Sequence, residues 1–370
     1  MKQARWVVAV RAAVPSPRPQ GWQALQQAVG LAESGCAEVH LVADAGRGDG
    51  GPDTAEAWLG RALPQALQLH QSRSPHNPPL AGVLFRRSLR SLASRDRLLL
   101  CRDPRVAASA PKRGRRHWAA VLMEWHIRPD LSMASHRRAL ERAELHLTPA
   151  AGLFDDLIAA GVPEDRVVLL PNACGLSVQR ARARAEAKIA RDAPVLALGL
   201  HRREGLDLAL DAWSSQASLP PLWLVGRDQG SVRYDGWMSR IDRDQRLRGR
   251  VRLLGPCWGD AREDLLDAAA LWLALYPEDD ETRTRLCPLQ VMDAAGSGLP
   301  VVASHLPSVS AALGEFPYGR VRDAASLVAA VQYAAAQPRP QAALVAGRPR
   351  WGDRAQILRD VVLERLEISA

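Results

Sequence analysis

One acidic residue, Asp293, lies in a segment whose sequence suits a phosphate-bearing ligand. Pro288 fits the first position of a short helix because its missing N–H is not needed there, and Gly296 and Gly298 fit the end of that helix. The apolar run at residues 299–303 is typical of a strand that is covered on both faces. A helix start offers unpaired N–H groups and a positive dipole end, so the segment predicts an anion there.

Arginines and glycines follow other predicted strands in the second half of the chain. Arg202 and Arg203 come soon after the apolar run at 194–198, and Gly226 follows the run at 222–225. Guanidinium groups keep their charge and bind diphosphates through paired hydrogen bonds, while glycine lets a ligand approach the backbone closely. We expect phosphate contact by at least one of the two arginines; the alternative is an exposed basic turn.

A second candidate site lies in the first half, where Glu124 precedes His126 by two residues at the end of an apolar run. A carboxylate and an imidazole placed together at a strand end are candidates for proton transfer or for contact with a substrate. The alternative is a histidine with a structural or surface role.

Short apolar runs alternate with helical patterns along the whole chain. The predicted strands of the first half are 6–10, 38–43, 98–101, 119–123, 145–148 and 167–170, with an amphipathic helix at 21–34. The predicted strands of the second half are 194–198, 222–225, 251–254, 271–275 and 300–303, with helices near 205–216, 261–269, 288–296 and 323–336. This alternation indicates parallel sheets with helices on both faces, and such sheets bind ligands at the carboxyl ends of their strands.

Length and composition indicate a globular α/β protein of two domains. A chain of 370 residues is too long for one ordinary core, and 47% of its residues are hydrophobic. We expect one Rossmann-like, doubly wound domain at 1–175 and a second at 176–350, followed by a terminal helix at 351–370. The five cysteines include no C-x-x-C pair, which argues against a disulfide framework and against a zinc site.

The net charge of +9 is concentrated in the first half of the chain. Residues 1–175 hold 23 Lys and Arg against 16 Asp and Glu, a balance of +7. Such an excess favours an anionic partner: a phosphorylated substrate, an acidic membrane surface or a nucleic acid. No apolar run reaches the ~18 residues needed to span a bilayer, and the apolar start of the chain is short for a signal peptide. We therefore expect a cytoplasmic protein.

Several segments occur in an order that resembles one enzyme family. They are Leu122–His126, Ala143–Thr148, Pro171-Asn172, Arg203–Trp213, Leu224–Gly226, Val251–Gly255 and the segment around Asp293. This ordered set resembles the retaining glycosyltransferases of family 4, or group 1, over nearly the whole chain. The resemblance implies the GT-B fold, in which two Rossmann-like domains face each other across a cleft. It also implies that the helix at 351–370 crosses back onto the first domain.

The resemblance implies that the domain at 176–350 binds a nucleotide sugar linked to UDP or GDP. The donor-binding residues that it implies are Arg202, Arg203, Gly226, Glu281, Arg285, Leu289 and Asp293. Asp293 aligns with the motif acid of the family that is implied to bind the ribose hydroxyls. The family's other motif acid falls on Arg285, so that Glu281, the nearest acid upstream, is the candidate to contact the donor sugar.

The resemblance also implies the reaction, a retaining transfer of a hexosyl group. His126 and Arg203 are the predicted catalytic residues, and Arg11, Gly21, Trp22 and Glu124 are predicted to face the acceptor. We expect no cofactor and no obligatory metal, because arginines can stabilise the leaving diphosphate. The expected acceptor is a glycan or a lipid-linked molecule in polysaccharide biosynthesis at the cell envelope. The basic first domain suits peripheral contact with the inner face of the membrane.

Three alternatives stay open beside this interpretation. The same architecture serves sugar-nucleotide epimerases and phosphorylases, although the full set of cleft acids and histidines that an epimerase needs is not evident. A catalytically degenerate GT-B protein could act as a binding or assembly subunit, as the arginine at position 285 suggests. A nucleic-acid-binding function would rest on charge alone, and we expect no such partner.

Overall fold

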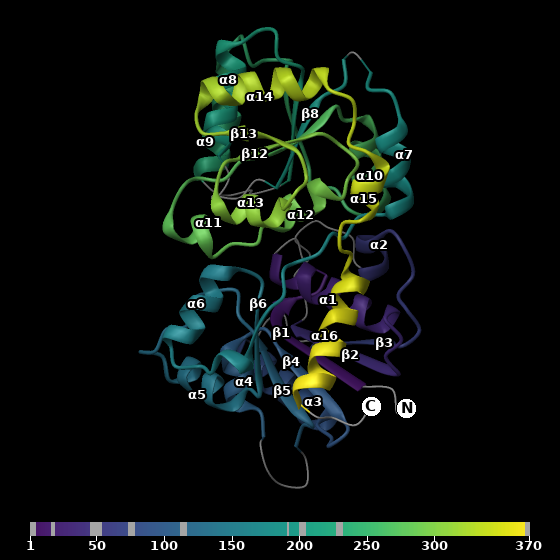
Figure 1. Cartoon of the computed structure of the whole chain (residues 1–370), viewed down its shortest axis with the longest axis vertical. Coiled ribbons are helices and arrows are strands. Elements are labelled where there is room, and N and C mark those ends of the chain that lie inside the picture. The colour runs from purple at the N-terminus through teal and green to yellow at the C-terminus, as the bar shows by residue number, and fades with distance from the viewer. Residues whose placement is uncertain are drawn as a thin grey trace. The chain divides into compact units, whose positions relative to one another are not determined.

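The computed structural model describes residues 5–15, 19–44, 54–72, 78–111, 117–190, 192–199, 205–226 and 232–366. The chain divides into two compact units (Figure 1). The first unit comprises Met1–Asn172 together with Pro349–Ala370, and the second unit comprises Ala173–Arg348. Each is an α/β unit built around one parallel sheet, as the alternation of strands and helices predicts.

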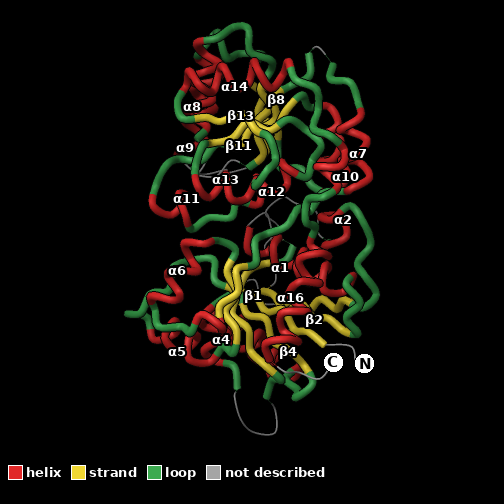
Figure 2. Tube along the Cα trace, in the orientation of Figure 1, coloured by secondary structure: helices red, strands yellow, loops and turns green. Residues whose placement is uncertain are grey.

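In the described residues, the first unit forms a seven-stranded sheet in the order β3-β2-β1-β4-β5-β6-β7. Its strands are β1 (Arg5–Ala13), β2 (Glu38–Asp44), β3 (Leu67–Ser72), β4 (Arg97–Cys101), β5 (Ala120–Glu124), β6 (Leu145–Thr148) and β7 (Val167–Leu169). The strands of the unit lie side by side in Figure 2. Every neighbouring pair is parallel, so all the strands end at one edge of the sheet. The strand order reverses between β1 and β4, the kind of position where ligands bind in such sheets.

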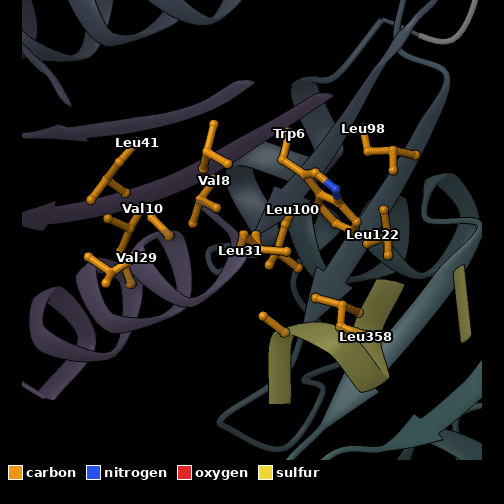
Figure 3. Close-up of a cluster of buried hydrophobic side chains, with 14 of the residues drawn as sticks. Trp6, Val8, Val10, Val29, Leu31, Leu41, Leu98, Leu100, Leu122 and Leu358 are labelled. Atoms are coloured by element: carbon orange, nitrogen blue, oxygen red, sulfur yellow. The ribbon is translucent and has the colours of Figure 1, made fainter. Parts of the chain in front are cut away.

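Helices cover both faces of this sheet. They are α1 (Pro19–Glu33), α2 (Ala55–Leu59), α3 (Pro78–Leu92), α4 (Pro104–Ser109), α5 (Ala134–Arg142), α6 (Ala151–Ala159) and α16 (Trp351–Leu366). Trp6 and Val8 of β1 point into a core formed with α1 and with Leu358 of α16 (Figure 3). Val7 and Ala9 belong to the core on the opposite face. Because both faces are buried, β1 is an almost unbroken apolar run, and each large side chain contributes about 1.5–3 kcal/mol.

The terminal helix α16 packs closely on α1. A Cβ atom on Gly30 of α1 would lie 2.3 Å from the carbonyl oxygen of Trp351, at the first residue of α16. Only glycine therefore fits at this crossing. The close approach places the first turns of α16 beside α1 and near the end of β5, where Arg354 contacts Glu124.

The second unit forms a six-stranded parallel sheet in the described residues, in the order β10-β9-β8-β11-β12-β13. Its strands are β8 (Val195–Leu198), β9 (Leu222–Val225), β10 (Val251–Leu254), β11 (Leu271–Ala274), β12 (Val301–Ser304) and β13 (Tyr318–Val321). Its helices are α7 (Val178–Glu186), α8 (Leu206–Ser215), α9 (Val232–Arg243), α10 (Gly259–Ala268), α11 (Asp280–Thr284), α12 (Leu289–Ala295), α13 (Pro307–Leu313), α14 (Ala324–Ala336) and α15 (Ala342–Ala346).

The segment around Asp293 forms the predicted loop, helix, glycine turn and strand. Its helix is α12, which begins at Leu289, one residue later than expected, because Pro288 is the N-cap and not the first helical residue. Gly298 has a φ of +85°, and a Cβ atom there would lie 2.2 Å from the carbonyl oxygen of Ala181 in α7. Gly296 instead has a φ of −94°, so only the second of the two glycines adopts the left-handed conformation.

A buried histidine of the first unit predicts a stability that depends on pH. His146 of β6 is fully buried and accepts a hydrogen bond from Trp125 Nε1 at 3.0 Å. Burial, aided by the charge of Arg166, lowers the pKa of His146 to about 4. In the unfolded chain the histidine binds a proton near its ordinary pKa of about 6.5. Its contribution to the free energy of unfolding is therefore complete above that pH and is lost as the pH falls towards 4.

We expect this single group to remove about 3 kcal/mol of stability across that pH window. The measurement is the free energy of unfolding in urea at pH 7.5 and at pH 4.5. In His146→Gln the difference between the two pH values is expected to shrink, whereas His117→Gln, elsewhere in the same unit, is expected to leave it unchanged. An equal pH dependence in the wild type and in His146→Gln would contradict the assignment.

Candidate functional site

Buried charged residues gather at the carboxyl ends of β4 and β5 in the first unit. Arg102 directly follows β4, Glu124 is the last residue of β5, and His126 lies two residues further on. Since β4 and β5 are parallel neighbours, they bring these three side chains to the same edge of the sheet. Arg354 joins them from α16, and Gln23 and Gln27 from α1. We call these six residues the Glu124 cluster.

Two guanidinium groups share the single carboxylate of Glu124. Glu124 Oε1 lies 2.6 Å from Nη2 of Arg354 and 3.2 Å from Nε2 of His126, and Oε2 lies 3.3 Å from Nε of Arg102. Only 1–2% of the side chains of Glu124, Arg102 and Arg354 is exposed, whereas 20% of the His126 side chain is exposed. The imidazole is therefore the member of the cluster that a ligand reaches most directly.

Arg354 is held on every side. Its Nε donates to the carbonyl oxygen of Pro171 at 2.8 Å, and its Nη2 donates to that of Leu170 at 3.1 Å. Its Nη1 donates to Gln27 Oε1, and its guanidinium carbon lies 5.2 Å from the ring centre of Trp351. A planar guanidinium with this set of acceptors is fixed in position, and it fixes the carboxylate of Glu124 in turn.

The charges of the cluster set the protonation states of Glu124 and His126. Burial opposes ionisation of Glu124, but Arg102 and Arg354 outweigh it and hold the pKa of that carboxyl well below its ordinary value. Burial, and next the positive charge of Arg102, lower the pKa of His126. Near neutral pH the cluster thus contains an ionised carboxylate, two cations and a neutral imidazole, with one positive charge in excess.

The other residues predicted on the acceptor side have partners of their own. Arg11 of β1 forms an ion pair with Asp44 at 3.0 Å, and its guanidinium carbon lies 5.1 Å from the ring centre of Phe85. Gly21 is buried in the first turn of α1. Trp22 packs on Trp58 of α2, with ring centres 6.3 Å apart. The structure thus brings Glu124 and His126 together, while the partners of Arg11 and Trp22 named here lie outside the Glu124 cluster.

In the second unit, Asp293 is held from two sides. It lies in α12 with 4% of its surface exposed. Its Oδ2 accepts from Nη2 of Arg262 in α10 at 2.5 Å, and its Oδ1 accepts from the backbone N–H of Gly175 at 2.8 Å. The carboxylate thus ties α12 to α10 and to the start of the unit. Its contact with a ribose stays a prediction.

The remaining donor-side residues lie on nearby loops and helices of the second unit. Glu281 belongs to α11, and the backbone N–H of Arg285 donates to the carbonyl oxygen of Glu281 at 3.0 Å. Leu289 is the first residue of α12 and is half-buried. Gly226 follows β9 with a φ of +147°, which L side chains rarely adopt. The predicted Arg202 and Arg203 lie outside the described residues.

Three arginines that contact the candidate residues were not predicted from the sequence. Arg102 stands directly after a predicted strand, a position that marked other candidates, and this signal could have identified it. Arg354 lies three residues after Trp351 and one before Ala355, on the apolar face of the terminal helix, where a charged residue is unexpected. No local pattern marks Arg262, since its partner Asp293 lies 31 residues away.

Among the described residues, no group of three or more His, Cys, Asp or Glu side chains is arranged to hold a metal ion. All five cysteines are free thiols; Cys257 is half-buried and the other four are buried. No helix within the described ranges is both long enough and apolar enough to cross a membrane.

Comparison with known proteins identifies the fold through structure rather than sequence. No family model matches the chain, and no curated protein matches it by sequence. The structure is similar to the lipopolysaccharide outer core galactosyltransferase WaaB, with a TM-score of 0.61 and 14% identity over 97% of this chain and 99% of that chain. It is also similar to HepE of Anabaena in complex with UDP and glucose, with a TM-score of 0.63 and 15% identity over 98% of this chain and 100% of that one.

A third similar structure is the sucrose-phosphate synthase of Thermosynechococcus elongatus. Its TM-score is 0.65, with 17% identity over 99% of this chain and 98% of that chain. At such low identity the likeness establishes the fold. The chain has the GT-B fold of glycosyltransferases, with two parallel-sheet α/β domains, which confirms the predicted fold class.

Proposed function

We propose that this protein is a glycosyltransferase that moves a sugar from a nucleotide diphosphate donor to an acceptor. The observation that carries the proposal is a likeness to HepE in complex with UDP and glucose over 98% of this chain, with the Glu124 cluster at the strand ends of the first unit. The finer proposal is a retaining hexosyl transfer of the family 4 type, from a UDP- or GDP-linked sugar.

The proposed donor site lies in the second unit, at the strand ends that carry Gly226 and the helices α11 and α12. Asp293 is proposed to accept hydrogen bonds from the ribose hydroxyls. A carboxylate has about four lone-pair sites, and Arg262 and Gly175 use two of them, which leaves capacity for a ribose. Arg262 then orients the carboxylate. Glu281, Arg285 and Leu289 are proposed to line the sugar and phosphate positions.

The proposed chemistry depends on arginine rather than on an obligatory metal. In the transition state the bond between the sugar and the diphosphate breaks, and negative charge builds up on the leaving diphosphate. Arg202 and Arg203 are proposed to stabilise that charge, since guanidinium groups bind phosphate oxygens in pairs. His126 is proposed to bind the sugar or the acceptor hydroxyl from the first unit, where its imidazole is neutral and partly exposed.

The acceptor is proposed to be a glycan or a lipid-linked molecule of the cell envelope. The support is the positive balance of residues 1–175 and the excess positive charge of the Glu124 cluster, which favour an anionic or phosphate-bearing acceptor. Arg11, Gly21 and Trp22 are proposed to line the acceptor side. The same charge suits peripheral contact with the inner face of a membrane.

Binding of a sugar nucleotide is the first testable consequence. We expect one member of a panel of UDP-, GDP- and ADP-sugars to raise the melting temperature; a ligand at 100 times its Kd stabilises the folded state by about 2.7 kcal/mol. The matching free sugar without nucleotide is the control. The product of the binding donor, analysed by NMR at the anomeric carbon, then tests the retaining stereochemistry. A melting temperature that no nucleotide in the panel raises would contradict the proposal.

A second candidate function is a degenerate GT-B protein that binds a partner without catalysis. The observations that favour it are the ion pair that Arg262 forms with Asp293 and the arginine at position 285, where the family carries an acid. This candidate predicts that a nucleotide sugar binds weakly or not at all, and that no free nucleoside diphosphate is released. Release of nucleoside diphosphate that depends on His126 would exclude it.

A further inference from the structure

The side chain of Arg102 contacts one of the two ring nitrogens of His126. Arg102 Nη2 and His126 Nε2 are hydrogen-bonded to each other. A guanidinium group has five N–H donors and no acceptor, and it stays protonated in proteins. In this pair the histidine must therefore accept, so its Nε2 is unprotonated.

The position of the proton on the ring follows from this contact. A neutral imidazole carries one N–H, and when Nε2 accepts, the proton resides on Nδ1. The carboxylate oxygen Glu124 Oε1 lies 3.2 Å from the same Nε2. At this distance an Nε2–H tautomer donates a hydrogen bond to Glu124, whereas in the Nδ1–H tautomer both atoms hold lone pairs and that hydrogen bond is absent.

Glu124 and Arg354 hold Arg102 where this contact requires it. Arg102 Nε lies 3.3 Å from Glu124 Oε2, and Arg102 Nη2 also donates to Gln23 Oε1. Arg354 fixes the other carboxylate oxygen, Oε1, at 2.6 Å. With 2% of their side chains exposed, both arginines are shielded from solvent. The guanidinium of Arg102 is thus placed by a buried ion-pair network that extends to the terminal helix.

We propose that Arg102 is a positioning residue that fixes His126 as the neutral Nδ1–H tautomer, with Glu124 and Arg354 holding Arg102 in place. His126 then presents an N–H donor from Nδ1, and its Nε2 is occupied. Such an imidazole donates a hydrogen bond to a ligand oxygen and does not serve as a general base through Nε2. The nature of that ligand, an oxygen of the sugar or of the acceptor, rests on the proposed transferase function.

The test is a spectroscopic one that needs no turnover. Long-range 1H–15N correlation spectra of the protein labelled with 15N-histidine distinguish the Nδ1–H tautomer, the Nε2–H tautomer and the imidazolium. His126→Gln assigns the signals of His126. At pH 7 we expect the wild type to show the Nδ1–H tautomer. An Nε2–H tautomer or an imidazolium in the wild type would overturn the proposal, whether or not any variant folds.

Two variants separate positioning from a general structural effect. Arg102→Met removes the donor, and we expect His126 to change to the Nε2–H tautomer, with Nε2 donating to Glu124 Oε1. The matched control is Arg105→Met, an exposed arginine three residues further on that pairs with Asp103, and it is expected to keep the Nδ1–H tautomer. An unchanged tautomer in folded Arg102→Met would overturn the proposal. If no donor sugar binds the protein, the proposed function fails while this result still stands.

Discussion

Replacing Glu124 by Gln is expected to destabilise the first unit by about 3–5 kcal/mol, the range for a buried ion pair that loses one partner. The substitution keeps the shape of the side chain but leaves Arg102 and Arg354 without the negative charge that both of them face. Two guanidinium groups with 2% exposure then lie close together without compensation. The measurement is the free energy of unfolding in urea, compared with the wild type at pH 7.

The exposed Glu164→Gln of the same unit is the matched control and is expected to leave stability unchanged. A double variant, Glu124→Gln with Arg354→Met, removes one of the two uncompensated charges. Because the two residues are in contact, we expect the double variant to lose less stability than the sum of the single ones. A Glu124→Gln protein as stable as the wild type would show that the carboxylate does not anchor the cluster.

The second large effect concerns turnover. His126→Ala is expected to lower kcat about 10²–10³-fold, the cost of removing one positioned hydrogen-bond donor at a charged transition state. The physical reason is that His126 is the partly exposed member of the Glu124 cluster. In the variant, no other group there replaces its N–H as a hydrogen-bond donor. The measurement is release of nucleoside diphosphate at saturating donor, with donor affinity followed separately by thermal shift.

We expect donor affinity to stay near the wild-type value in His126→Ala, because the proposed donor site lies in the second unit. His117→Ala, a histidine of the first unit outside the Glu124 cluster, is the matched control for kcat. A kcat near that of the wild type in His126→Ala would show that this residue takes no part in the reaction. If donor affinity falls together with kcat, His126 is instead assigned to the donor site.

The interior strands were predictable from the sequence, and two of the four edge strands were not. Strands such as β1 and β8 are buried on both faces, so their apolar runs identify them. The edge strands β3 (Leu67–Ser72) and β13 (Tyr318–Val321) mix polar residues or glycine with apolar ones, so no apolar run identifies them, and they were missed. The helix α7 lies in a segment rich in arginine and alanine, which does not identify a packed helix, yet its Arg184 is buried and pairs with Glu263 of α10.

The candidate site was predictable only where a single segment carries it. Glu124 and His126 lie two residues apart at one strand end, so the sequence alone brings them together. Arg354 reaches Glu124 across 230 residues, through the packing of α16 on the first unit. Likewise the contact between Arg262 and Asp293 depends on how α10 meets α12. Such pairs arise from the tertiary fold, which no local spacing encodes.

A crystal structure of the protein with the best-stabilising sugar nucleotide tests the central claim most directly. The account predicts the nucleotide at the strand ends of the second unit. Its ribose hydroxyls are expected to donate hydrogen bonds to Asp293, and the nucleotide is expected to lie close to the protein backbone at Gly226. It also predicts His126 within hydrogen-bonding distance of the sugar or of the open acceptor position. A nucleotide bound elsewhere, or absent from crystals soaked well above its Kd, would contradict the assignment of this chain as a nucleotide-sugar glycosyltransferase.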